Sequence, residues 1–362
     1  MSNHGTTARG LRIAVLGTAS IARKNIRAIA LASSDISVVV VASRDPERAR
    51  VYCGEVGLPE STSCCTYQDA LNMDIINAVY IPLPTTLHLE WVTKAARAGK
   101  HILCEKPIAV DLETLNSIVS VCEEMNVELM DGVMFMHHPR LSTLVSTLRP
   151  LTPLHVSSSF TFLGDEDFFK NNIRCNGGDP LGCLGDLGYY NIRISLTAFD
   201  YTLPSHAHGV ILEENEHGVP ITMSCGMRWE DGRSCSFTCS FRMQTQQWVK
   251  IACKESHVDI DDFVIPNDET HANFDIVKEG FVEEARRCQS NKEQVEVENV
   301  KPQQTLMWEE FANRVQKRCE GGGQSSSGNF GMSYEVMTQL CIEACMRSAR
   351  EGSREVDVRK SF

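Results

Sequence analysis

Leu11–Ala22 reads LRIAVLGTASIA, an apolar run that stops at Gly17 and gives way at once to a helix-compatible segment. A strand, a tight glycine turn and a helix in this order are typical of the opening unit of a dinucleotide-binding fold. The helix N-terminus offers backbone N–H groups and a positive dipole end to a pyrophosphate. Ala19 and Ala22 replace the second and third glycines of G-x-G-x-x-G, and the first of these replacements crowds the phosphates slightly. An ordinary strand–turn–helix of an α/β protein is the alternative.

Composition limits the classes of protein that this chain can belong to. The 362 residues predict about two domains, and a hydrophobic content of 42% is enough for sizeable cores. A formal net charge of -12 argues against a nucleic-acid or anionic-membrane surface. The opening residues hold no secretory h-region, and the 15 scattered cysteines form no C-x-x-C pair. We therefore expect reduced thiols, no metal, no nucleic-acid or membrane partner, and a cytoplasmic location.

The second strand carries information about the cofactor at its end. Ile36–Ala42 is a continuous β-branched run, as expected for a strand buried on both faces of a parallel sheet. An acidic residue after it would select NAD by binding the ribose 2′-hydroxyl. The chain has Ser43 and Arg44 instead, which suit the 2′-phosphate of NADP. Asp45 is predicted to cap the next helix, and a solvated surface arginine is the alternative for Arg44.

A loop that holds two prolines follows the strand Ala78–Ile81. It lies at the carboxyl end of a parallel strand, where α/β sheets bind ligands. Thr85 or Thr86 is predicted to cap the helix that follows. His88 is a candidate for contact with the cofactor or substrate, and packing of its ring against its own loop is the alternative.

The strand His101–Cys104 delivers Glu105, Lys106 and Pro107. A lysine at the carboxyl end of a parallel strand is predicted to point toward the cofactor crevice as a fixed cation. A further helix and strand complete an alternating β/α pattern that spans Leu11 to about Gly132.

Five motifs together resemble the glucose–fructose oxidoreductase / inositol dehydrogenase / MocA (Gfo/Idh/MocA) family of NAD(P)-dependent oxidoreductases. They are Gly17–Ala22, Ser43-Arg44, Pro84–His88, Glu105-Lys106-Pro107 and Gly182–Tyr190. The likeness covers nearly the whole chain, and it is strongest to a plant-type branch near dihydrodiol and D-xylose dehydrogenases.

The resemblance implies an α/β fold with an N-terminal Rossmann dinucleotide-binding domain, residues 1–134. A C-terminal α+β domain with an open, mainly antiparallel sheet would follow in residues 135–362 and serve substrate binding and dimerisation. The return of the final helices onto the N-terminal domain is left open. Many members have a catalytic histidine where this chain has Tyr190, and members with tyrosine there use it as the proton donor.

The second half of the chain holds the remaining candidates. Asp186 and Tyr190 are four residues apart and would share one face of a helix. The alternative makes Asp186 a helix cap and Tyr190 a core aromatic. By resemblance, the acidic loop near Asp165 and the residues after it line the substrate pocket, with Arg174 as a substrate or loop anchor. An ordered polar loop is the alternative there. Strands are predicted near residues 206–212, 221–228, 234–240, 248–252 and 257–260, and a flexible loop at 321–328.

The resulting hypothesis is an enzyme, an NADP(H)-dependent oxidoreductase (NAD is possible) that forms a homodimer. It would transfer a hydride between the nicotinamide and an alcohol or carbonyl of a sugar, polyol, cyclic diol or specialised metabolite. A free tyrosine has a pKa of about 10, so Lys106 would lower the pKa of Tyr190 and help it act as general acid/base, with Asp186 orienting substrate. A non-catalytic nucleotide-binding regulator or scaffold, and a redox-neutral glycosidase, are the alternatives. The cofactor candidates are Gly17, Thr18, Ala19, Ser20, Ile21, Ser43, Arg44, Pro82, Leu83, Thr85, His88, Glu105 and Lys106; the substrate candidates are Arg174, Asp186 and Tyr190.

Overall fold

The computed structural model describes residues 10–282, 287–299, 301–320 and 333–361, so the predicted loop at 321–328 lies outside the described residues. The chain divides into two compact units. The first unit consists of Met1–Ala109, Glu113–His137 and Lys301–Phe330. The second unit consists of Val110–Leu112, His138–Val300 and Gly331–Phe362.

A six-stranded parallel sheet in the order β3-β2-β1-β4-β5-β6 forms the centre of the first unit. Its strands are β1 (Leu11–Leu16), β2 (Ile36–Ala42), β3 (Ser63–Cys65), β4 (Ala78–Ile81), β5 (His101–Cys104) and β6 (Leu129–Asp131). This order, with β1 in the middle and the chain wound outward in both directions, confirms the predicted Rossmann fold.

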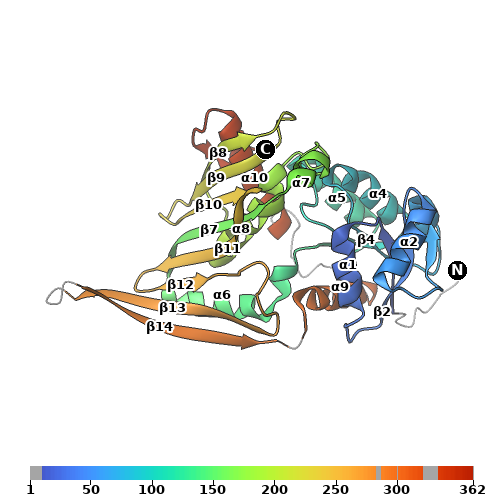
Figure 1. The fold of residues 1–362 in the computed structure, drawn as a ribbon, viewed down its shortest axis with the longest axis horizontal. Helices are drawn as coiled ribbons and strands as arrows, with labels where there is room; N and C mark the ends of the chain where they lie inside the picture. Colours follow the sequence, from blue (N-terminus) through green and yellow to red (C-terminus); the bar gives the residue numbers. More distant parts are fainter. Residues whose placement is uncertain (1–9, 283–286, 300, 321–332, 362) are drawn as a thin grey trace. The chain divides into compact units, whose positions relative to one another are not determined.

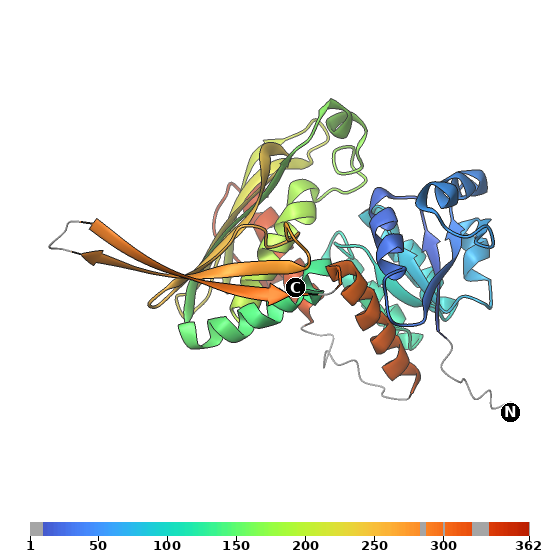
Figure 2. The same ribbon diagram turned by 60° about the horizontal axis from the view of Figure 1, so that its bottom comes forward.

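Helices lie along both faces of this sheet (Figures 1 and 2). They are α1 (Ser20–Ile29), α2 (Pro46–Val56), α3 (Tyr67–Leu71), α4 (His88–Arg97), α5 (Leu112–Glu124) and α9 (Gln303–Cys319), with 3-10 turns η1 (Thr85–Leu87) and η2 (Met134–His137). Because both faces are covered, the inner parts of the central strands are continuous apolar runs and do not alternate. Ile13, Val15, Val40 and Val41 are all fully buried.

Helix α9 belongs to the first unit although it lies far along the chain. Its Thr305 hydroxyl donates to the carbonyl oxygen of Ala28 at 3.0 Å, and the Trp308 indole N–H donates to Oδ1 of Asn25 at 2.8 Å. Trp308 is fully buried. The helix therefore packs on α1 through specific hydrogen bonds as well as through apolar contact.

The second unit is built on a nine-stranded sheet in the order β14-β13-β12-β11-β7-β10-β9-β8-β15. Among the neighbouring strands that the structure describes, only β7 and β10 run parallel, so the sheet is mainly antiparallel, as predicted. The strands are β7 (Pro153–Leu163), β8 (His206–Glu214), β9 (Pro220–Arg228), β10 (Ser234–Ser240), β11 (Arg242–Cys253), β12 (His257–Ile260), β13 (His271–Val282), β14 (Arg287–Glu298) and β15 (Val356–Asp357).

One face of this sheet is covered by helices. They are α6 (Pro139–Leu151), α8 (Tyr189–Ala198) and α10 (Tyr334–Arg350), and α8 is preceded by a π-helical turn, η3 (Leu184–Gly188). The opposite face carries no helix in the part of the chain that the structure describes (Figure 2). Strands β13 and β14 form a long hairpin at one edge of the sheet (Figure 1), and the sequence patterns did not predict it.

The predicted threonine cap of α4 is wrong. Neither Thr85 nor Thr86 caps α4, because these residues form the 3-10 turn η1, which leads directly into the helix. The N-cap position of α4 is Leu87, which makes no side-chain cap hydrogen bond. The helical geometry thus begins before the α-helix, and a threonine cap has no place at its start.

Candidate functional site

The glycine turn after β1 has the geometry of an anion cradle. Gly17 has a φ of +128°, and its N–H donates to the carbonyl oxygen of Ala42 at 2.9 Å. A Cβ at this position would lie 3.3 Å from Cδ2 of Leu83 and would strain the backbone. Helix α1 starts at Ser20 without a side-chain cap from Ala19 and without an acidic residue in its first turn. The helix N-terminus therefore suits the phosphates of a dinucleotide.

Tyr52 of α2 supports this glycine turn through a hydrogen bond. Sequence patterns did not reveal this contact. Its hydroxyl donates to the carbonyl oxygen of Ala19 at 3.1 Å. Burial raises the pKa of Tyr52 to about 12, so the hydroxyl remains a donor at physiological pH. The contact joins residues 33 positions apart, and no local pattern predicts it.

Two arginines follow β2, Arg44 directly after the strand and Arg48 in the first turn of α2. Ser43 is buried, and its Oγ accepts from the N–H of Asp45 at 3.3 Å. Asp45 caps α2 by accepting from the N–H of Glu47, as predicted. Arg44 and Arg48 are both exposed, and both guanidiniums oppose the rise that burial causes in the pKa of Tyr67.

Arg44 and Arg48 therefore lie near one phenol ring. Arg48 was missed, although its place four residues after Arg44 at the start of a helix could have indicated it.

The loop after β4 lies next to the glycine turn. Leu83 is the side chain that a Cβ at Gly17 would meet, and the Pro82 carbonyl oxygen lies within 4 Å of the same point. Thr85 is buried. His88 is fully buried, with Nε2 at 2.9 Å from the Leu83 carbonyl oxygen and Nδ1 at 3.0 Å from that of Ile108. These contacts favour the alternative in which His88 packs against its own loop and fixes its path.

A directed series of hydrogen bonds ends at Glu105, just before Lys106. The Trp308 indole donates to Asn25, and the Asn25 amide donates to the Tyr80 hydroxyl at 2.8 Å. Tyr80 in turn donates to Oε1 of Glu105 at 2.5 Å. The series holds the carboxyl end of β5 in place, and the half-buried Lys106 follows directly.

Gly132 leaves room for the Glu105 carboxyl group. A Cβ on Gly132 would approach the Glu105 carboxyl atoms to 3.1 Å, closer than ordinary contact. The backbone at Gly132, directly after β6, therefore packs closely against the Glu105 carboxyl group.

The second unit gathers the three substrate candidates. Nε of Arg174 lies 2.8 Å from Oδ2 of Asp186. The Asp186 carboxylate raises the pKa of Arg174, and the Tyr190 phenol adds to this effect. Asp186 lies in η3 and Tyr190 in the first turn of α8, so the turn and the helix together present both groups to the same guanidinium.

Aromatic rings fix the position of Tyr190, which is only 5% exposed. The Phe160 ring of β7 packs edge-to-face against it with centroids 5.5 Å apart, and Tyr189 lies 6.3 Å away. The Asn191 amide donates to the Ser158 hydroxyl at 2.8 Å, which joins α8 to β7. Little freedom remains for the phenol ring.

The acidic segment near Asp165 was expected to be a loop, and this is wrong. Residues Glu166–Asn171 form the short helix α7, and Asp165 caps it by accepting from the N–H of Phe168 at 2.8 Å. The acidic residues stand in the first turn of α7, where the helix dipole favours negative charge.

The described residues contain no helix long and apolar enough to cross a membrane. Within the same residues, no group of three or more His, Cys, Asp or Glu side chains is arranged to hold a metal ion.

Residues 11–133 match a family model described as an oxidoreductase family with an NAD-binding Rossmann fold. The chain is 29% identical over 248 residues to D-xylose 1-dehydrogenase (NADP(+)) 2 of Haloferax volcanii, covering 68% of this chain and 74% of that protein. It is 31% identical over 235 residues to dTDP-3,4-didehydro-2,6-dideoxy-alpha-D-glucose 3-reductase of Streptomyces antibioticus, covering 60% and 69%.

Among solved structures, a 3-ketoreductase from Actinomadura kijaniata with NADP and TDP-benzene has the same fold. The TM-score is 0.77 at 23% identity, with 96% of this chain and 98% of that chain covered.

Proposed function

Because the chain belongs to the Gfo/Idh/MocA family of oxidoreductases, we propose that it transfers a hydride between NADP(H) and an alcohol or carbonyl carbon of a polyhydroxylated small molecule. The substrate class comprises sugars, polyols, cyclic diols and specialised metabolites. Relatives named as D-xylose, scyllo-inositol and dihydrobenzenediol dehydrogenases support this class.

The preference for NADP is supported by the two arginines after β2. Arg44 and Arg48 are exposed and both lie near Tyr67, so two guanidiniums are available for a 2′-phosphate. Guanidinium groups bind phosphate through paired charge-assisted hydrogen bonds. Relatives named as NADP(+) enzymes are consistent with this choice.

The proposed chemistry gives the cofactor and each candidate residue a separate role. NADP(H), when bound, supplies or accepts the hydride. The Tyr190 hydroxyl gives a proton to the substrate oxygen during reduction and its phenolate takes the proton back during oxidation. The Lys106 ammonium donates a hydrogen bond to the same oxygen and favours the ionised form of the tyrosine. Asp186, held by Arg174, accepts hydrogen bonds from substrate hydroxyl groups.

The cluster of Arg174, Asp186 and Tyr190 is the observation that carries the proposal. The guanidinium binds the largely buried carboxylate beside a phenol that is itself nearly buried, so the rotamers of Asp186 and Tyr190 are restricted. Such preorganisation is what acid–base catalysis on a sugar hydroxyl requires.

The test is a turnover assay with NADP+ and a panel of D-xylose, scyllo-inositol and trans-1,2-dihydrobenzene-1,2-diol, followed by NADPH absorbance. We expect turnover with at least one of them. Tyr190→Phe and Lys106→Met should each lower kcat on the order of 10²-fold while NADP+ still binds. Near-normal turnover in both variants contradicts the assignment. NADPH binding without turnover on the whole panel favours the alternative of a regulatory protein.

We also propose that the chain forms a homodimer through the helix-free face of the nine-stranded sheet. This face is lined by small polar side chains such as Ser157, Ser236 and Thr238, which are only partly buried or exposed. Light scattering after size-exclusion chromatography should give twice the chain mass of 40.3 kDa. A single-chain mass at micromolar concentration contradicts the proposal.

A further inference from the structure

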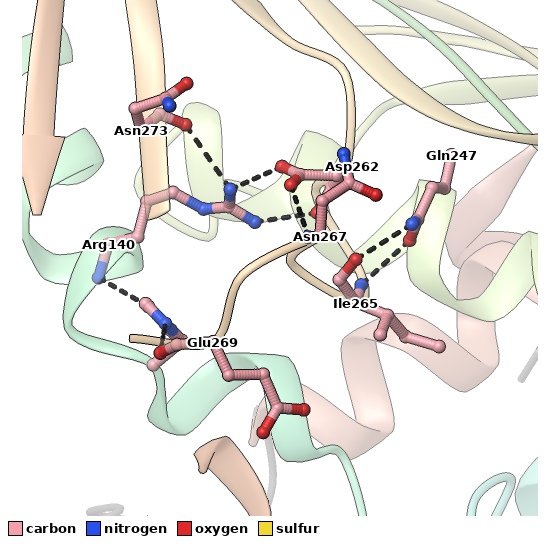
Figure 3. A network of polar contacts seen from close by, with 8 residues as sticks. Arg140, Gln247, Asp262, Ile265, Asn267, Glu269 and Asn273 are labelled. Atoms are coloured by element: carbon pink, nitrogen blue, oxygen red, sulfur yellow. Dashed lines mark hydrogen bonds and ion pairs between the residues drawn. The ribbon is translucent and has the colours of Figure 1, made fainter. Parts of the chain in front are cut away.

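A buried ion pair closes the ten-residue loop between β12 and β13, residues 261–270. Arg140, in the first turn of α6, is 4% exposed, and its Nη1 lies 2.5 Å from Oδ1 of Asp262 (Figure 3). Its Nη2 donates to the Asp262 backbone carbonyl at 2.7 Å, and Nη1 also reaches the Asn273 carbonyl at 3.3 Å. The other carboxylate oxygen of Asp262 accepts from the N–H of Asn267 at 2.7 Å. One guanidinium thus joins both ends of the loop to α6.

A second clamp holds the loop from the side of β11. The Gln247 side-chain amide donates to the Ile265 carbonyl oxygen and accepts from the Ile265 N–H, both at 2.8 Å (Figure 3). The Phe263 N–H donates to the Gln247 backbone carbonyl at 2.9 Å. Loops of this length are normally mobile on a protein surface. This one is tied by side chains from two other elements.

The clamped loop carries an aromatic ring toward the proposed proton donor. Phe263 is 3% exposed, and its ring packs edge-to-face on Phe160 at 6.4 Å. Phe160 packs edge-to-face on Tyr190 at 5.5 Å. The contacts therefore run without a gap from the ion pair through two phenylalanine rings to the phenol.

We propose that the Arg140–Asp262 pair positions Tyr190 for catalysis through Phe263 and Phe160. Edge-to-face contacts depend on ring orientation, and close-packed interiors transmit small displacements. A shift of Phe263 therefore turns Phe160 and moves the Tyr190 hydroxyl. Arg140 and Asp262 are positioning residues that touch no reacting atom. The inference rests on the proposed function of Tyr190.

A stabilising role alone would be the simpler explanation, since breaking a buried ion pair destabilises most proteins. The chain offers a matched control in the first unit. Arg318 and Glu128 form a pair at 2.8 Å whose side chains are 14% and 8% exposed. Asp262→Asn and Glu128→Gln each remove one carboxylate charge from a buried pair, so both should lower the unfolding midpoint.

The first experiment reads the environment of Tyr190 without substrate. The chain has 7 tyrosines, so labelling with 3-fluorotyrosine gives a ¹⁹F NMR spectrum with few resonances. The Tyr190 resonance is assigned as the one that is lost in Tyr190→Phe. We expect Asp262→Asn and Phe160→Leu to move or broaden this resonance and Glu128→Gln to leave it in place. If Asp262→Asn does not fold, Gln247→Ala tests the same clamp from its other side. An unmoved Tyr190 resonance in the folded clamp variants overturns the inference.

The second experiment is a double-mutant cycle on kcat, measured with the panel substrate that turns over fastest. Asp262→Asn should lower kcat on the order of 10-fold with the KM for NADP+ unchanged, and Asp262→Glu should restore part of it. In the Phe160→Leu background the same substitution should have almost no further effect, because the link to Tyr190 is already broken. Additive losses overturn the inference while leaving the proposed function intact. Full turnover in Tyr190→Phe would instead overturn the proposed function.

Discussion

The Tyr80 hydroxyl donates to the Glu105 carboxylate at 2.5 Å, deep in the first unit. Tyr80 is fully buried, and desolvation together with the charge of Glu105 raises its pKa well above the usual 10. The phenol therefore stays protonated and donates at every physiological pH. Its acceptor is the residue directly before Lys106, so the position of the proposed cation depends on a tyrosine in the neighbouring strand.

Tyr80→Phe should destabilise the protein and weaken the hold on the end of β5. The change removes one hydroxyl and leaves the Asn25 amide and the Glu105 carboxylate without that partner. We expect the free energy of unfolding in urea to fall by about 1–3 kcal/mol. Tyr67→Phe is the control, because the Tyr67 hydroxyl makes no hydrogen bond within the described residues. An equal loss of unfolding free energy in the two variants would contradict a stabilising role for the series of hydrogen bonds that ends at Glu105.

Arg44→Ala and Arg48→Ala should each raise the KM for NADP+ far more than that for NAD+. A charge-assisted hydrogen bond contributes about 1.5–3 kcal/mol, which corresponds to roughly 10- to 100-fold in affinity. Arg50→Ala is a matched control, since this exposed arginine of the same helix pairs with Glu47. Steady-state kinetics with both cofactors decide the question. A similar rise for both cofactors would exclude 2′-phosphate recognition.

Arg174→Met should impair catalysis by removing the ion pair that helps to hold Asp186. The carboxylate is 14% exposed and would lose its contact with the Arg174 guanidinium at 2.8 Å. We expect kcat/KM for the substrate to fall by about 10- to 100-fold with little change in the KM for NADP+. Arg242→Met serves as the control, because its guanidinium pairs with Glu213 and stacks on Phe169. A loss of the same size in the control would mean that Arg174 acts only on stability.

His101 should make stability depend on pH below neutrality. Burial, helped by the nearby Arg318 charge, lowers its pKa from 6.5 to about 4, and its Nδ1 accepts from the N–H of Glu128 at 3.0 Å. Between pH 6.5 and pH 4, His101 is therefore protonated in the unfolded chain and neutral in the folded chain. The free energy of unfolding should be unaffected by His101 above pH 6.5 and fall by up to about 3 kcal/mol as the pH drops toward 4.

Urea unfolding at roughly pH 7.5, above this window, and at roughly pH 5.0, inside it, would measure the part of the loss that has developed by the lower pH. His101→Asn, whose side-chain oxygen can still accept the hydrogen bond, should show a smaller difference between the two pH values. An unchanged difference would mean that other groups carry the pH dependence.

The parallel sheet could be predicted because its signal is local. Strands β1, β2, β4 and β5 are short apolar runs bounded by glycine, proline or polar residues, and their ends match the structure. The β13–β14 hairpin could not be predicted in this way. Residues 290–294 of β14 are exposed, so no burial period marks this part of the strand, which forms through pairing with its neighbour.

The candidate site shows the same division. Residue types at strand ends, such as Ser43 and Lys106, could be selected from the sequence because parallel sheets bind ligands there. The residues that support them could not. Tyr52, Tyr80 and Asn25 contact partners 33, 25 and 283 positions away, and nothing in the local pattern distinguishes them from ordinary helix and strand residues.

The place of α9 in the first unit also governs when that unit can be completed during synthesis. The Asn25 side chain can accept the indole N–H only after Trp308 has been synthesised, 283 residues later. At ribosomal rates of roughly 5–20 residues per second, the gap is on the order of 15–60 s. A nascent chain that already has all six strands of its parallel sheet therefore still exposes the surface against which the Trp308 indole later packs. The first unit can therefore begin to fold early in synthesis, but its packing is completed only after α9 has been made.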